Sequence, residues 1–173
     1  MASRWKDETV KATPIPTEFI LSQPGPSWLE LQWGFDRGWL SESAVVNLAV
    51  ARLSESGNQA PEVIELASLG SRELGEVRCV LDKLAETERR AAVDQDPERA
   101  WLRIILAWLY AQRGEIADPL GAVEEIYADF DYPSEISDFV RYMPPGDGYD
   151  PQAHTHEENI ARLYCKWREF LDA

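Results

Sequence analysis

Four residues have the chemistry of metal ligands: Asp129 and Asp131 in one segment, and His154 and His156 in another. Histidines at alternate positions of a loop can turn both imidazoles toward one ion, and carboxylates can complete such a ligand set. Water on that ion would make the chain a metal-dependent hydrolase. The spacings match neither the zinc-protease motif nor a calcium loop. The hydrolase is therefore our alternative hypothesis, and a histidine pair at a helix entrance is the simpler interpretation.

A second feature is a run of carboxylates and aromatic residues between Glu124 and Phe139. Residues 115–158 contain 12 acidic residues and one base, Arg141, so this quarter of the chain carries −11 of the net charge of −14. Helix dipoles favour carboxylates in first turns but not further along a helix. A solvated face is one interpretation. Because a basic partner would relieve the repulsion, we predict a partner-binding surface of six residues. They are Glu124, Glu125, Asp129, Asp131, Tyr132 and Asp138, and we expect Tyr132 to be exposed.

The charge and composition exclude several classes of function. Of 173 residues, 31 are acidic and 17 basic, and such a surface repels the phosphates of nucleic acid. No apolar run reaches the roughly 20 residues of a membrane helix, and the N-terminal residues lack the apolar stretch of a signal peptide. Two cysteines suit a reducing compartment, so we expect a cytoplasmic protein. No phosphate-binding glycine loop or cluster of zinc ligands is present, and we predict no cofactor.

These residues must be positioned by helices, because apolar residues recur at intervals of three and four after residue 26. We predict an all-α fold, a single-domain bundle of about seven to eight helices over residues 27–173. Four prolines within residues 1–26 predict an irregular N-terminal arm. Residues 100–111 contain one charge, Arg103, and should form the most buried helix. Capping residues indicate where the helices begin, and they are Ser41, Asp96, Asp118 and Thr155 with Glu158.

Several apolar residues have more specific expected places. Phe19, Ile20 and Leu21 should anchor the arm. Cys165 follows apolar residues in the C-terminal helix and should be a buried, inert thiol. In the segment WGFDRGWL, three aromatic residues either belong to the core or form a contact between copies of the chain. They are Trp33, Phe35 and Trp39, and the sequence leaves the oligomeric state open.

Three segments are similar to a known bacterial family. WGFDRGWLS near the start, EIYADFDYPSEISDFVRYMPP in the acidic region and HTHEENIARLYCKWREFL at the end resemble the family called domain of unknown function 2247. The likeness runs from about Ser27 to Leu171. The resemblance implies a bacterial cytosolic protein, and it supplies no catalytic residues.

The leading hypothesis is a non-enzymatic, acidic binding protein of the bacterial cytosol. Its partner would be a basic protein, and an analogy with immunity proteins suggests that this partner is a toxin.

Overall fold

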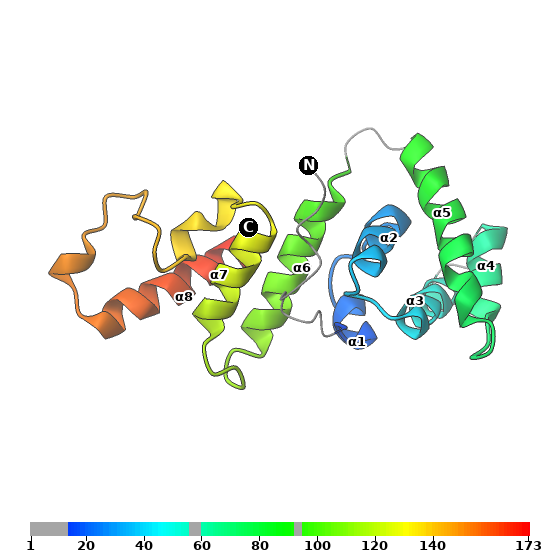
Figure 1. The fold of residues 1–173 in the computed structure, drawn as a ribbon, viewed down its shortest axis with the longest axis horizontal. Helices are drawn as coiled ribbons and strands as arrows, with labels where there is room; N and C mark the ends of the chain where they lie inside the picture. The colour runs from blue at the N-terminus through cyan, green and yellow to red at the C-terminus, as the bar shows by residue number, and fades with distance from the viewer. Residues whose placement is uncertain (1–13, 56–59, 92–94) are drawn as a thin grey trace. The chain divides into compact units, whose positions relative to one another are not determined.

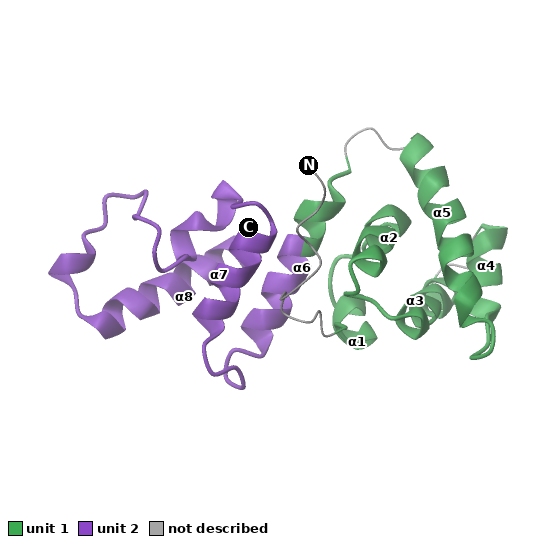
Figure 2. Ribbon diagram, viewed as in Figure 1, with its two compact units in different colours: residues 1–101 green, residues 102–173 purple. Residues whose placement is uncertain are grey.

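The structure is a computed structural model that describes residues 14–55, 60–91 and 95–173. These ranges contain eight α-helices, three short 3-10 helices and no strand (Figure 1). The prediction of an all-α fold is therefore confirmed. The chain divides into two compact units, residues 1–101 and residues 102–173 (Figure 2). The predicted single domain over residues 27–173 stays a prediction.

Unit 1, residues 1–101, is built around packed helices. α2 and α3 both pack against α5, and α4 packs against α3 and α5. Its core contains Leu31, Val45, Leu66 and Leu81, all buried. The elements are α1 (Thr17–Leu21), α2 (Trp28–Asp36), α3 (Glu42–Glu55), α4 (Pro61–Ser68), η1 (Leu74–Glu76), α5 (Val77–Ala91) and the first residues of α6 (Pro97–Ala111).

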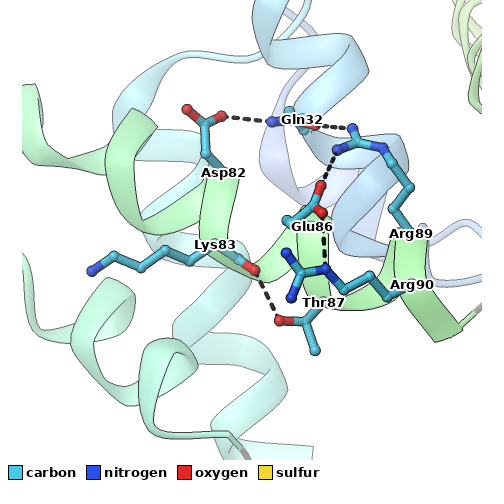
Figure 3. Close-up of polar contacts among 7 residues, drawn as sticks. All are labelled: Gln32, Asp82, Lys83, Glu86, Thr87, Arg89 and Arg90. Atoms are coloured by element: carbon cyan, nitrogen blue, oxygen red, sulfur yellow. Dashed lines mark hydrogen bonds and ion pairs between the residues drawn. The ribbon is translucent and has the colours of Figure 1, made fainter.

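Two polar side chains of α5 form hydrogen bonds with Gln32 of α2 (Figure 3). The amide of Gln32 donates to Asp82 at 2.5 Å and accepts from Arg89 at 3.1 Å. Arg89 and Arg90 both bind Glu86 on their own helix, at 2.6 and 3.0 Å. All of these contacts lie within unit 1.

The described part of the N-terminal arm packs against the rest of unit 1. Ile15 and Ile20 are fully buried, and the N–H of Ile15 donates to the carbonyl of Trp39 at 3.1 Å. Ile20 anchors the arm as predicted. Leu21 does not, because it is the last residue of a single helical turn and 45% of its surface is exposed. Residues 1–13 of the predicted arm lie outside the described residues.

The segment WGFDRGWL spans the end of α2 and the turn after it. A Cβ on Gly34 would stand 2.0 Å from the ring of Trp101, so this close packing requires glycine. Trp33, Phe35 and Trp39 are half-buried. Guanidinium groups of unit 1 lie over two of them, that of Arg37 over Trp33 and that of Arg78 over Phe35. Contact between copies of the chain stays a prediction.

Unit 2, residues 102–173, has an aromatic core around Trp167. Trp167 is fully buried; its ring stacks on Phe139 at 6.1 Å and meets Tyr110 edge-on at 5.1 Å. The remaining residues of α6 form part of this unit, where Leu102, Ile105 and Leu106 are buried. The elements that follow are α7 (Pro119–Asp129), η2 (Ser134–Phe139), η3 (Pro151–Ala153) and α8 (His156–Asp172).

Cys165 is exposed, contrary to the prediction of a buried thiol. It lies two residues before the buried Trp167, and two residues rotate an α-helix by about 200°. The thiol therefore lies on the opposite side of α8 from the core. Cys79, on α5, is exposed as well, and both cysteines are free thiols.

Candidate functional site

α7 ends in a turn made by two residues with left-handed backbone conformation. Asp131 has φ 56° and Tyr132 has φ 61°. The N–H of Tyr132 donates to the carbonyl of Tyr127 at 2.8 Å, and that of Asp131 donates to Ala128 at 3.3 Å. This is the Schellman pattern of helix ends, in which the first left-handed position is usually glycine. The turn fixes the direction in which Tyr132 leaves the helix.

Three tyrosines come together beside this turn, and we call them the tyrosine face: Tyr127, Tyr132 and Tyr142. Tyr127 is buried, while 57% of Tyr132 and 58% of Tyr142 remain exposed. The ring of Tyr132 meets that of Tyr127 edge-on at 5.3 Å, and the ring of Tyr142 lies 6.2 Å from it. The exposure predicted for Tyr132 is confirmed. The two outer rings are therefore held in place by a buried third ring.

The pKa of Tyr142 is raised above its ordinary value. Partial removal of the hydroxyl from water is the first cause, and the nearby Tyr127, Tyr132 and Glu124 add to it. Glu124 of α7 is the only carboxylate among these causes, and its contribution is the smallest.

Glu124 forms an ion pair with Arg141 of the same chain. Arg141 donates to both carboxylate oxygens of Glu124, at 2.8 and 2.9 Å, and to those of Asp118 at 3.1 and 3.0 Å. The pKa of Asp118 is lowered, first by the N–H of Gly121 and then by Arg141. Both carboxylates raise the pKa of Arg141. The only base of residues 115–158 is thus already bound, which lowers the charge that Glu124 can offer a partner.

Asp129 and Asp131 lie at the C-terminal end of α7, where the helix dipole disfavours negative charge. The last turn of α7 contains no basic residue. Burial alone raises the pKa of Asp129, with no bond or cation to offset it. Within the described ranges, neither carboxylate forms an ion pair. Both would therefore gain from a cation supplied from outside.

The two remaining predicted residues, Glu125 and Asp138, are outside the turn itself. Glu125 is exposed one helical turn before Asp129 on α7. Asp138 is in η2, which packs against α8, and its charge helps to raise the pKa of Lys166. The six predicted residues therefore do not form one cluster: Asp131 and Tyr132 are adjacent, Glu124 is paired internally, and Asp138 faces α8.

Tyr142 belongs to the site but is not among the six residues predicted from the sequence. It lies 15 residues after Tyr127, beyond η2, and no local spacing signals that the two rings meet. The one available signal was that Tyr142 belongs to the aromatic residues interleaved with the acidic run.

The comparison with protein families gives a match over residues 17–173, to the model described as "uncharacterized protein conserved in bacteria (DUF2247)". The chain belongs to the DUF2247 family. No curated protein matches it, and no solved structure does. The predicted resemblance is confirmed.

The histidines of this DUF2247 protein lie around the start of α8. The ring of His154 stacks on Tyr149 at 4.6 Å, and its Nδ1 is 3.7 Å from Glu158. His156 is the exposed first residue of the helix. In the part of the chain that the structure describes, no three His, Cys, Asp or Glu side chains are grouped so that they could hold a metal. The hydrolase built on these residues stays a prediction.

Unit 1 of the DUF2247 protein has an apolar groove between α3 and α4, with Val50 and Ile64 exposed on it. Its two serines, Ser54 and Ser68, donate to carbonyls of their own helices, so the groove offers a ligand few polar partners.

No helix in the described ranges is both long and apolar enough to cross a membrane. The tyrosine face with its carboxylates is the stronger candidate site.

Proposed function

We propose that this DUF2247 protein is a non-enzymatic binding protein, and that the end of α7 binds a basic protein. The observation that carries the proposal is the pair of exposed tyrosines, Tyr132 and Tyr142, beside the turn that follows α7, where Asp131 directly precedes Tyr132 and forms no ion pair among the described residues. Exposed aromatic residues held rigidly on a surface are typical of the residues that dominate binding energy. The surrounding negative charge favours a partner of opposite sign.

The electrostatics of α7 support binding of a cationic surface. Asp129 and Asp131 oppose the helix dipole, so in the free protein they cost stability. A partner's lysine or arginine would remove that cost on binding. Glu125, exposed on α7 beside them, would add to the attraction without a direct contact.

We further propose that the partner is a toxin and that binding neutralises it in the bacterial cytosol. The support is an analogy with small acidic immunity proteins, together with the family's occurrence in bacteria. If the toxin is a nuclease, the carboxylates would occupy the place of substrate phosphates. Two free, exposed thiols suit the reducing cytosol.

A pull-down from bacterial lysate tests the proposal. The bait is the full chain, compared with an α7 variant in which Glu125, Asp129 and Asp131, on α7 and in the turn after it, are replaced by lysine. A matched variant carries Glu76→Lys, Glu115→Lys and Asp172→Lys, which makes the same charge change at exposed positions elsewhere.

We expect a basic protein that the wild type and the matched variant retain and that the α7 variant loses. Its association rate should fall as salt rises, because steering by charge is screened. Equal recovery by all three baits, or an association rate independent of salt, would contradict the proposal.

A further inference from the structure

Arginine side chains cover aromatic rings repeatedly on this molecule. Six such pairs occur in the described ranges, with the guanidinium carbon 3.6 to 5.8 Å from the ring centroid. They are Arg37 with Trp33, Arg52 with Trp28, Arg78 with Phe35, Arg103 with Phe170, Arg113 with Tyr110 and Arg162 with Tyr149. No arginine of the described ranges lies over Tyr132 or Tyr142, although these are the most exposed aromatic rings among them.

The pair of Arg162 with Tyr149 shows how a guanidinium group binds beside a ring and a carboxylate in this protein. Arg162 lies 4.5 Å from the ring centroid of Tyr149, and its Nη2 is 2.9 Å from both carboxylate oxygens of Asp147. Only 13% of the Arg162 side chain remains exposed. In the same unit, then, a carboxylate and a nearby tyrosine of one loop hold a guanidinium by an ion pair and by a cation–π contact.

Asp131 and Tyr132 offer the same two groups without the arginine. They are adjacent in the turn after α7, and the second exposed ring, Tyr142, lies on the same buried tyrosine. The C-terminal end of α7 adds the partial negative charge of its carbonyls. A planar guanidinium suits this combination better than an ammonium group, because it can stack on a ring while it binds a carboxylate.

We propose that the tyrosine face, with Asp131, is an arginine site that takes a guanidinium side chain from the partner's surface. This inference rests on the proposed function and adds the chemistry of the contact. The partner's arginine would lie against Tyr132 and Tyr142 as Arg162 lies against Tyr149.

The test titrates the full chain with the acetylated, amidated tripeptide Gly-Arg-Gly and follows the tyrosine ring signals by NMR. The comparison peptide is Gly-Lys-Gly, blocked in the same way. We expect saturable shifts of the Tyr132 and Tyr142 rings, and binding of the lysine peptide several-fold weaker. The ring of Tyr149 is the internal control, because Arg162 already covers it. Absence of saturable shifts at Tyr132 and Tyr142, or equal affinity for both peptides, overturns the proposal.

Two variants separate the ring from the charge. Tyr132→Asn removes the ring, and Asp131→Asn removes the charge; asparagine tolerates the left-handed backbone at both positions. Each should weaken binding of the arginine peptide about two- to fivefold, as expected for one exposed cation–π or charge contact. Circular dichroism of each variant checks that the helices are retained. Unchanged affinity in both variants overturns the assignment.

The two proposals can fail separately. If the lysine variant of α7 loses its partner but Tyr132→Asn keeps it with full affinity, the arginine site is wrong and the binding function stands. If the tripeptide binds but the α7 variant retains every lysate protein, the site exists and the proposed function is wrong.

Discussion

Asp129 and Asp131 lie at the C-terminal end of α7, whereas Glu157 and Glu158 lie in the first turn of α8. The second pair meets the positive end of a helix dipole, and Glu158 completes a capping box with Thr155. The first pair meets a negative end without a base in the last turn. Carboxylates that look alike in sequence therefore have opposite effects on stability. Only Asp129 and Asp131 would be stabilised by a cation from outside the chain.

We expect the largest change in the free energy of unfolding when the N-cap of α8 is removed. Thr155→Ala removes the side chain that accepts from the N–H of Glu158 at 3.2 Å. Loss of such a cap costs about 1 kcal/mol of the free energy of unfolding. Urea unfolding followed by circular dichroism measures it. A variant as stable as the wild type would show that the cap of α8 contributes nothing, and the contrast between the two helix ends would weaken.

Asp131→Gly should have the opposite sign. Glycine adopts the φ of 56° without strain and removes a carboxylate from the wrong end of a helix. We expect the free energy of unfolding to rise by about 0.5–1 kcal/mol, measured in the same urea experiment. Because binding should weaken while stability rises, a variant that is both less stable and fully active in binding would break the comparison.

Asp129→Asn should raise stability in a way that depends on pH. Burial raises the pKa of folded Asp129, so its ionised form costs stability above that pKa, and the cost disappears as pH falls through it. We expect a gain of about 0.5 kcal/mol at neutral pH that shrinks toward zero below about pH 4. Urea unfolding at several pH values tests this, and a constant gain across the range would contradict it.

Glu157→Gln should have the smallest effect on stability, and it is the matched control for Asp129→Asn. It also removes one negative charge, but from the first turn of α8, so stability should fall by about 0.3 kcal/mol. Partner binding should not change. If Glu157→Gln and Asp129→Asn shift the unfolding midpoint in the same direction, net charge decides stability and the position on the helix does not.

The sequence predicted what depends on neighbours along the chain. Ser41, Asp96, Asp118 and Thr155 cap helices as expected, since each side chain accepts from an N–H three residues ahead. Periodicity was also enough for the all-α fold. Cys165 was predictable in principle, because its offset from Trp167 already places it on the other side of α8.

The candidate site depended on contacts that local patterns do not contain. Arg141 reaches carboxylates 17 and 23 residues away, which removed Glu124 from the free charges. Pro133 marked a helix end nearby, but the Schellman turn lacks its usual glycine, so the sequence did not indicate the left-handed conformation of Asp131 and Tyr132. The meeting of Tyr142 with Tyr127 depends on the path of η2, which no period describes.

The two exposed thiols give the chain its own pair of labelling sites. Cys79 lies in unit 1 and Cys165 in unit 2, and these are the only two cysteines of the sequence. A donor and an acceptor dye coupled through maleimide chemistry would therefore place one fluorophore on each unit without any engineered residue. Energy transfer between them would report whether the distance between the units changes when a candidate partner protein is added.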